Sequence, residues 1–349
     1  MIWLDKARGG WSIAVMFTHP RVTFVSEPTP LERLARLSER LGIDLWIKRD
    51  DLAGTTFGGN KARQLEFYLG AAAATHCDTV LITGAVQSNF VRTAAALAAK
   101  IGMRTIVQLE QRVPGQDALY QGSGNVILNR LLGAQIIHYP NGEDEAGADA
   151  ALRARAAVER ARGHRPYVIP LALGNPPLGA LGYVQAAKEI MAQKDDFDVV
   201  VVASGSGLTH AGLLAGLGNS GFDGEVIGSC VRRDAVQQRA RIRTVLDDLA
   251  PMIEMFAPVP DQRIDLWDEA LTPGYGQAGA AALAAIEMMA RDEGLILDPV
   301  YTGKVFAAIP ALVNAGRIAK GSKVCFVHTG GLASVFAYQT VLERAFEQL

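Results

Sequence analysis

The stretch VVVVASGSGLTHAGLLAGL, residues 199–217, decides the fold of this 349-residue chain. Its first five residues are an apolar, β-branched run that predicts a buried strand over 199–203, and residues 209–217 predict a helix. The glycine-rich turn between them places the start of the helix beside the carboxyl end of the strand. A strand, a short turn and a helix in this order are typical of an α/β protein built from βαβ units.

The same alternation of short β-branched runs and longer helical patterns extends along the chain in both directions. The expected strands cover residues 44–48, 79–83, 105–109, 135–139, 199–203, 225–230 and 323–328. The expected helices cover residues 61–74, 89–101, 124–132, 150–162, 178–193, 209–217, 233–249, 277–293, 305–314 and 332–346. Because several strands are largely apolar, we expect mostly parallel sheets with helices on both faces.

This many units predict two open sheets rather than one. The helix expected at 150–162 is unusually charged, as an exposed outer helix would be, and it precedes a proline-rich stretch at 166–177. We therefore expect a smaller inserted α/β domain over residues 65–170, within a larger cofactor-binding domain formed by residues 1–64 and 171–349.

The composition excludes several classes of protein. With 34 Lys and Arg against 36 Asp and Glu, the net charge of −2 gives no basic surface for nucleic acid. The three cysteines, Cys77, Cys230 and Cys325, form no CxxC pair, so neither a disulfide framework nor a zinc site is expected, and no metal is predicted. The apolar runs are too short to cross a membrane.

The N-terminal segment bears on the location of the protein. Lys6 and Arg8 precede a short apolar stretch that faintly resembles a signal peptide, but the stretch is brief and no small-residue cleavage site follows it. Met16 is an alternative start to Met1. We expect a cytoplasmic protein.

Glycine accounts for 36 of the 349 residues, and many of these glycines lie in turns that follow strands. The turn at 204–208 offers backbone N–H groups and hydroxyls at the start of a helix, which suits a phosphate group. It lacks the Lys-Ser/Thr pair of a Walker loop, and His210 stands where a dinucleotide-binding fingerprint has its third glycine. A glycine-rich turn without a ligand is the alternative interpretation.

A second turn, FGGNK at residues 57–61, opens the helix expected at 61–74. Because a helix N-terminus disfavours cations, Lys61 should have a lowered pKa and a more nucleophilic amine. The two glycines before it allow the close approach of a flat or bulky group. An ordinary surface lysine is the alternative.

A third turn, TGAVQSN at residues 83–89, places Ser88 as the cap of the next helix, and a helix start beyond a strand also suits a carboxylate. Capping alone is the alternative for this turn. Two more strand-to-helix turns are PVYTGK at 299–304 and HTGG at 328–331. A nucleophilic lysine, a phosphate cradle and a carboxylate site together indicate pyridoxal phosphate and an amino-acid substrate, with Lys61 as the Schiff-base lysine.

These motifs, in this order, resemble the pyridoxal-phosphate-dependent D-cysteine desulfhydrase and 1-aminocyclopropane-1-carboxylate deaminase family. The resemblance runs from about Pro28 to the C-terminus and implies the tryptophan synthase β-subunit fold, fold type II. It rests on KRDD (48–51), GGNK (58–61), QSN (87–89), GSGN (122–125), GALGY (179–183), ASGSG (203–207), LDPVYTGK (297–304) and HTGG (328–331).

The resemblance implies a role for each candidate site residue. The catalytic residues would be Lys61, Ser88 and Tyr301. The residues around the cofactor would be Lys61, Asn89, Ser204, Gly205, Ser206, Gly207, Leu208, Thr209, Thr329 and Gly330. The residues facing the substrate would be Asn60, Gln87, Ser88, Phe90, Tyr275 and Tyr301. Thr329 would place a neutral hydroxyl against the pyridine nitrogen, which makes the ring a weaker electron sink and favours β-elimination.

The resemblance also implies the reaction. Cyclopropane deaminases typically have Glu at the position of Thr302 and Leu at that of Thr329, so this chain is similar to the desulfhydrase branch. We expect a lyase that converts D-cysteine to pyruvate, sulfide and ammonia. L-cysteate and 1-aminocyclopropane-1-carboxylate are alternative substrates, because Phe90 stands where members commonly have His or Gln. The alternative from another class of enzyme is an NAD-dependent oxidoreductase. Because enzymes of the resembled fold are usually homodimers, the resemblance also implies a homodimer.

Overall fold

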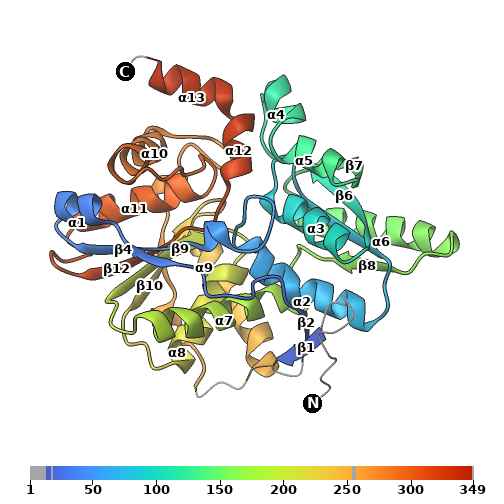
Figure 1. The fold of residues 1–349 in the computed structure, drawn as a ribbon, viewed down its shortest axis with the longest axis horizontal. Helices are drawn as coiled ribbons and strands as arrows, with labels where there is room; N and C mark the ends of the chain where they lie inside the picture. The colour runs from blue at the N-terminus through green and yellow to red at the C-terminus, as the bar shows by residue number, and fades with distance from the viewer. Residues whose placement is uncertain (1–12, 17–18, 254–256, 348–349) are drawn as a thin grey trace.

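The computed structural model describes residues 13–16, 19–253 and 257–347, which form two open sheets flanked by helices, beside a short β-hairpin (Figure 1). In spatial order, the larger sheet consists of β11 (Asp265–Trp267), β10 (Glu225–Cys230), β9 (Val199–Ser204), β12 (Lys323–Val327), β4 (Asp44–Lys48) and β3 (Leu31–Arg33). Only the edge strand β3 pairs antiparallel.

The smaller sheet has four parallel strands, and all of them come from the middle of the chain. In spatial order they are β7 (Gln135–Tyr139), β6 (Arg104–Glu110), β5 (Thr79–Ala85) and β8 (Pro166–Ile169). The hairpin strands are β1 (Ile13–Met16) and β2 (His19–Val22). The prediction of an α/β protein with two open, mostly parallel sheets is confirmed. The domain boundaries at residues 64 and 170 stay a prediction.

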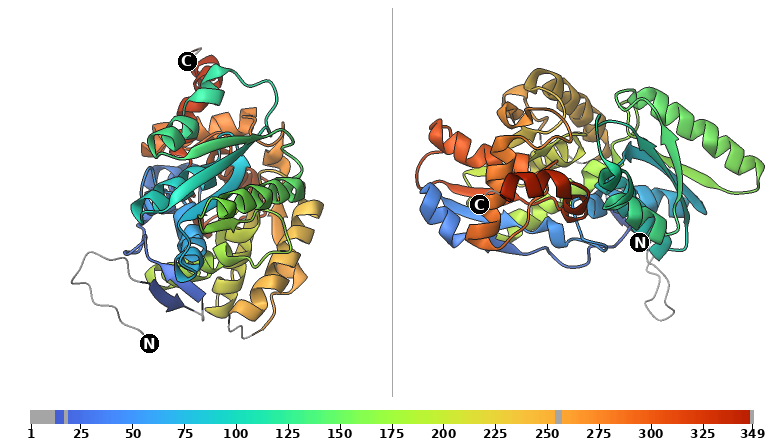
Figure 2. Two further views of the ribbon diagram at one scale, coloured as in Figure 1. Left: turned by 90° about the vertical axis from the view of Figure 1, so that its right-hand side faces the viewer. Right: turned by 90° about the horizontal axis from the view of Figure 1, so that it is seen from above.

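The helices lie on both faces of each sheet (Figures 1 and 2). Those that precede the larger sheet's β9 are α1 (Ala35–Leu41), α2 (Lys61–Ala74), α3 (Asn89–Lys100), α4 (Ala118–Gly122), α5 (Asn125–Leu131), α6 (Glu145–Ala161) and α7 (Leu178–Gln193). Those that follow it are α8 (Leu208–Asn219), α9 (Ala235–Leu249), α10 (Ala280–Glu293), α11 (Thr302–Asn314), α12 (Leu332–Ala337) and α13 (Gln339–Phe346).

The run of four valines in β9 shows why this strand is central. Val200 and Val202 pack into the cluster formed with α7, α8 and α9, whereas Val199 and Val201 pack into the cluster formed with α1, α10 and α11. All four side chains are buried. Alternate residues of a strand point to opposite faces, so a strand covered on both sides needs an uninterrupted apolar run.

The structure differs from the sequence prediction mainly at short elements. The strands β3, β8 and β11 have only three or four residues, too few for a recognisable period. The helix expected at 332–346 is broken at Tyr338, whose hydroxyl donates to the carbonyl of Gly276 at 2.6 Å. That contact holds the chain between α12 and α13 against the loop that carries Tyr275.

Membrane-spanning helices and metal clusters were both sought in the described part of the chain. No helix there is long and apolar enough to cross a membrane. No group of three or more His, Cys, Asp or Glu side chains there is arranged to hold a metal ion. The N-terminal residues 1–12, which bear on the signal-peptide question, lie outside the described ranges.

Candidate active site

A single cleft collects the strand-to-helix turns of both sheets. Its walls include the start of α2, the end of β5 with the start of α3, the turn between β9 and α8, and the turn after β12. The segment 170–177, between β8 and α7, closes one side. Because the turns at the carboxyl ends of parallel strands meet at one edge of a sheet, distant parts of the sequence converge here.

Lys61 is the first residue of α2 and lines this cleft. Its ammonium nitrogen lies 3.3 Å from the side-chain oxygen of Gln64 and 5.6 Å from the centre of the Phe90 ring, and no carboxylate pairs with it among the described residues. Burial without a counter-ion lowers the pKa of Lys61 to about 8. A large fraction of the amine is therefore neutral, and so nucleophilic, near pH 8.

The glycines before Lys61 let the turn at 57–61 pack closely against neighbouring backbone segments. A Cβ atom on Gly58 would lie 1.7 Å from the carbonyl oxygen of Asp51, so no other residue fits there. The next backbone N–H groups, of Gly59 and Asn60, donate to the carbonyls of Asp50 and Thr329. The start of α2 is thereby fixed against the turn that follows β12.

The turn between β9 and α8 has the properties of a phosphate site. Gly207 is the N-terminal cap of α8 at φ 96°, and no side chain caps this helix end. The Thr209 hydroxyl accepts hydrogen bonds from the amides of Asn60 at 2.9 Å and Gln64 at 2.8 Å. A hydroxyl has one donor and two acceptor sites, so its hydrogen is left to donate into the cleft. Uncapped helix N–H groups and a free hydroxyl donor fit an anion such as a phosphate.

The start of α3 forms a second polar wall. Ser88 caps the helix as predicted, accepting from the N–H of Val91 at 3.3 Å, and both Ser88 and Asn89 line the cleft. The side-chain oxygen of Asn89 accepts from the amide of Asn125 at 3.0 Å. The NH2 group of Asn89 is therefore the part left to donate into the cleft.

Two tyrosines form the opposite wall, and their hydroxyls are 2.6 Å apart. Tyr301 is held by Asp298, whose carboxylate accepts from the N–H of Tyr301 at 2.8 Å, and Tyr275 belongs to a loop whose carbonyls at Leu271 and Gly274 accept from the buried Lys304. Burial and the Tyr275 hydroxyl raise the pKa of Tyr301 well above its usual value. Tyr301 therefore remains a protonated donor near neutral pH.

Thr329 closes the far end of the cleft, with its hydroxyl in no hydrogen bond among the described residues. The preceding His328 is buried, its Nδ1 accepts from the N–H of Gly330 at 3.3 Å, and burial lowers its pKa. The ring is therefore neutral near pH 7. The group facing this end of the cleft is an uncharged hydroxyl rather than an acid.

Most of the predicted site residues line the cleft, and two do not. Those that do are Asn60, Lys61, Ser88, Asn89, Phe90, Gly205, Ser206, Gly207, Leu208, Thr209, Tyr275, Tyr301, Thr329 and Gly330. Ser204 is turned away: its hydroxyl lies 3.1 Å from Nδ1 of His210 and accepts from Gln238 at 2.9 Å. Gln87 is also turned away, and its amide bonds the carbonyls of Tyr120 and Ser123.

The contacts of Gln87 position other residues of the cleft, and its place beside the substrate stays a prediction. Its side-chain oxygen accepts from the N–H of Asn125 at 2.8 Å, and its own carbonyl accepts from the Asn125 amide at 3.1 Å. Because Asn125 in turn orients Asn89, Gln87 affects the cleft indirectly, through Asn125 and Asn89. Ser204 holds the buried His210 beneath the phosphate turn.

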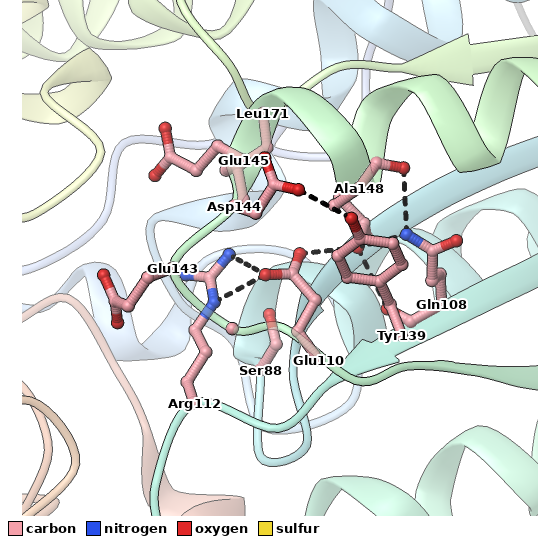
Figure 3. A network of polar contacts seen from close by, with 12 residues as sticks. Ser88, Gln108, Glu110, Arg112, Tyr139, Glu143, Asp144, Glu145, Ala148 and Leu171 are labelled. Atoms are coloured by element: carbon pink, nitrogen blue, oxygen red, sulfur yellow. Dashed lines mark hydrogen bonds and ion pairs between the residues drawn. The ribbon is translucent and has the colours of Figure 1, made fainter.

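Sequence reasoning missed the charged residues of the cleft. Arg112 follows β6, Arg232 follows β10, and Arg241 and Glu145 come from α9 and α6. Figure 3 shows the guanidinium of Arg112 directed at the carboxylate of Glu110. Nη2 of Arg112 donates to this carboxylate at 2.7 Å. Arg112 and Arg232 lie beyond the carboxyl ends of strands, so the rule that found Ser88 would have found them as well.

Comparison with known proteins gives consistent results. A family model described as "Pyridoxal-phosphate dependent enzyme" matches residues 22–330. A protein of Yersinia pestis named D-cysteine desulfhydrase is 41% identical over 324 residues, covering 91% of this chain and 96% of that protein. A protein of the same name from Salmonella typhimurium is 40% identical, with the same shares of each chain covered.

Solved structures agree with these matches. The crystal structure of a homologue of 1-aminocyclopropane-1-carboxylate deaminase has a TM-score of 0.80 and 32% identity, covering 94% of this chain and 97% of that one. Threonine deaminase isoform 2 of Solanum lycopersicum has a TM-score of 0.65 at 18% identity, covering 93% and 85%, which shows a shared fold only.

Proposed function

This chain belongs to the pyridoxal-phosphate-dependent enzymes, and from that premise we propose that it is a carbon–sulfur lyase that converts D-cysteine and water to pyruvate, hydrogen sulfide and ammonia. The resemblance and the cofactor expected from the sequence are confirmed by the family match. The observation that carries the proposal is the buried amine of Lys61, which pairs with no carboxylate of the described residues and shares its cleft with the uncapped start of α8, in a chain 41% identical to a D-cysteine desulfhydrase.

The residues present fit the cofactor. Lys61 supplies the amine that would hold its aldehyde carbon, and the turn 205–209 supplies the N–H groups and the Thr209 hydroxyl that would hold its phosphate. Asn89 and Thr329 also line the cleft and would present an amide and a hydroxyl to the cofactor. When bound, pyridoxal phosphate supplies an electron sink that acidifies the Cα–H bond of an amino acid.

The substrate side is formed by the start of α3 and the two tyrosines. The helix end at Ser88 and Asn89 suits the carboxylate of the amino acid, because its N–H groups and dipole favour an anion. When the amine of Lys61 is not bonded to the cofactor, it would be the base that removes the Cα proton, since its pKa is about 8. Tyr301, protonated and held by Asp298, donates a proton to the departing sulfur.

Thr329 favours elimination over competing reactions. A hydroxyl does not hold a ring nitrogen protonated as a carboxylate would, and the neighbouring His328 is also uncharged. The weaker electron sink favours a reaction whose negative charge leaves with the leaving group. Thr302, by contrast, is buried and its hydroxyl donates to Asp298 at 2.7 Å, so it acts on the substrate only by positioning Tyr301.

The same proposal includes the setting of the enzyme. The described cysteines Cys77, Cys230 and Cys325 are free thiols, as suits a reducing cytoplasm. We place the enzyme there, and as a homodimer, the usual state of the resembled fold.

The test is the product spectrum of the purified holoenzyme. Pyruvate and sulfide are measured with D-cysteine, L-cysteine, L-cysteate, D-serine and β-chloroalanine, and 2-oxobutyrate with 1-aminocyclopropane-1-carboxylate. We expect pyruvate and sulfide from D-cysteine, and loss of both in Lys61→Ala but not in Lys100→Ala, which replaces an exposed lysine at the end of α3. Release of 2-oxobutyrate without pyruvate from D-cysteine would overturn the proposal.

A further inference from the structure

Four arginine side chains, each at least four-fifths buried, gather beside the cleft, and all of them except Arg233 line it. They are Arg112, Arg232, Arg233 and Arg241. In the part of the chain that the structure describes, only two buried carboxylates pair with them: Glu110 pairs with Arg112, and Glu145 pairs with the other three at 2.5 to 3.0 Å. A third carboxylate, Glu143, is three-quarters exposed and lies 3.3 Å from Arg232. The buried part of this cluster therefore has two more positive charges than negative ones.

Two of the four arginines are accounted for by the phosphate turn. Arg233 donates to the carbonyl of Gly205 at 3.2 Å, and Arg241 donates through Nε to the carbonyl of Ser206 at 2.7 Å. Both therefore fix the turn from behind and add positive charge next to the predicted phosphate position.

The other two arginines face the substrate side instead. The guanidinium carbon of Arg232 lies 6.0 Å from the centre of the Tyr275 ring. Burial opposes the charge on Arg112, but its interactions with Tyr275, Glu110 and Tyr301 outweigh burial and raise the pKa of Arg112. Two cations from different elements, the segments after β6 and after β10, thus converge beside Tyr275.

Both of these guanidinium groups have donors to spare. The side chain of Arg232 is only 7% exposed, and its buried Nε has no hydrogen-bond partner among the described residues. Arg112 uses Nε and Nη2 on a single oxygen of Glu110, and no hydrogen bond of the described residues uses its Nη1. A buried N–H without an acceptor is costly, so an acceptor supplied by a ligand would be stabilising here.

We propose that Arg112 and Arg232 form an anion subsite for the substrate's β-substituent, so that the enzyme also accepts, besides D-cysteine, β-substituted alanines whose leaving group bears a negative charge, such as a sulfonate. This inference rests on the proposed function. Guanidinium groups suit a sulfonate because their planar donors pair with its oxygens. The carboxylate of the same substrate is left to the start of α3, where Ser88 lies.

For cysteate the reaction balances without a further reagent. The Cα proton is removed, the Cβ–S bond breaks with its electron pair on the departing sulfite, and one water supplies the keto oxygen of pyruvate as ammonium leaves. Two donors at the sulfonate stabilise the charge that leaves with the sulfur.

The test compares Arg232→Met and Arg112→Met with Arg243→Met, whose side chain lies on α9 and pairs with Asp247 and Asp261. We measure kcat/KM of the holoenzymes for both enantiomers of cysteate and for D-cysteine. The ratio of cysteate to D-cysteine should fall about tenfold or more in the first two variants, as expected for loss of a charge-assisted hydrogen bond, and stay constant in the third. Arg232→Lys, which keeps the charge but removes Nε, should lower it less.

A binding measurement keeps the proposal testable if a variant does not fold. Aspartate has an anionic β-substituent that cannot leave, so both enantiomers are titrated into the wild-type holoenzyme, and the shift of the cofactor's visible absorption is recorded. Saturable binding of aspartate, with alanine at least tenfold weaker, supports the subsite. If D-cysteine is turned over but neither cysteate nor aspartate is accepted, the subsite is refuted and the proposed function stands.

The remaining outcomes also discriminate. If Arg232→Met and Arg112→Met weaken cofactor binding while the ratio of cysteate to D-cysteine is unchanged, the two arginines serve the phosphate and the proposal is overturned. If no amino acid yields pyruvate and the protein shows no visible cofactor band, it is the proposed function that fails.

Discussion

Lys61 is the residue on which the chemistry depends, and its environment sets its ionisation. The amine is buried between Gln64 and the ring of Phe90, and among the described residues no carboxylate offsets the loss of water. From the sequence, we expect the helix N-terminus to lower the pKa of Lys61, whereas in the structure burial of the amine lowers this pKa. Both effects disfavour the charged form, so the direction is the same.

The lowered pKa of Lys61 predicts how the apoenzyme takes up its cofactor. Only the neutral amine attacks an aldehyde, so the rate of pyridoxal phosphate incorporation should rise through a pH near 8 and level off above it. For an ordinary lysine the rise would occur about two pH units higher. Stopped-flow absorbance between pH 6.5 and 10 measures this; a rate still climbing at pH 10 would contradict the assignment.

Thr209 carries a second prediction at this scale. Its hydroxyl accepts from two buried amides and has a hydrogen left for the phosphate, so Thr209→Val removes an acceptor and a donor together. We expect cofactor affinity to fall about ten- to a hundredfold, equivalent to about 1–3 kcal/mol. Equilibrium dialysis of the apoenzyme measures it, with the exposed Thr75→Val as the matched control. Equal affinities of the two variants would argue against a phosphate at α8.

At the scale of elements, the segment from Asp298 to Lys304 shows how one motif positions two tyrosines. Asp298 accepts from the N–H groups of Val300 and Tyr301, while Lys304, three residues later, bonds two carbonyls of the Tyr275 loop. The residues of the motif other than Tyr301 therefore act by positioning.

Replacing Lys304 with Met should separate positioning from chemistry. The change keeps an unbranched apolar stem but removes the ammonium group that links the carbonyls of Leu271 and Gly274, each of which keeps only a backbone N–H donor. Tyr275 should then no longer be held beside Tyr301. We expect kcat to fall about tenfold, equivalent to about 1.4 kcal/mol in activation free energy, with the cofactor's absorption band unchanged. A normal kcat with a raised KM would show that the Tyr275 loop serves only binding.

The sequence allowed prediction of the elements that are covered on both faces. Strands such as β4 and β10 and helices such as α2 and α7 match the expected bounds, because buried runs leave a strong pattern. The edge strands β3 and β11 left none, since three residues show no period.

The site was predictable to a similar degree and for a similar reason. Turns between a strand and a helix can be recognised in a sequence by their glycine and hydroxyl residues. These turns indicated Lys61, Ser88 and Thr209 as site residues. Which way a side chain points within such a turn is decided by tertiary packing, and the side chains of Ser204 and Gln87 are directed toward His210 and Asn125 rather than into the cleft. The pairing of Arg232 with Glu145, 87 residues apart in the chain, depends on how the two sheets face each other.

At the scale of the whole molecule, a buried ionic network joins β4 and the start of α2 to α7. Arg63 of α2 donates to Asp50 at 2.9 Å and to Glu189 of α7 at 2.9 Å, and Lys48 of β4 also pairs with Glu189. Burial opposes ionisation of Asp50, but Arg63 outweighs it and lowers the pKa of that carboxyl. The network lies directly beneath the turn that carries Lys61, since Gly59 bonds the carbonyl of Asp50.

This network predicts both a mutational and a pH effect on stability. Arg63→Met leaves the buried carboxylate of Asp50 without its cation, although Glu189 keeps Lys48, and should cost about 3–5 kcal/mol, while Asp50→Leu combined with Arg63→Met should recover part of that loss. Because the pKa of Asp50 is lowered on folding, its contribution is present above about pH 4 and is lost as the pH falls below it. Urea unfolding at pH 7 and at about pH 3 measures both; strictly additive single and double variants would contradict the coupling.

The central claim is that Lys61 holds pyridoxal phosphate in the cleft between the two sheets. Reduction of the holoenzyme with borohydride fixes the cofactor to the lysine that holds it, and peptide mass mapping then identifies that lysine. We predict that the label is found on the peptide containing Lys61 and is absent from the Lys61→Ala variant. Label on another lysine, such as the buried Lys304, or no label on a protein saturated with cofactor, would contradict the assignment.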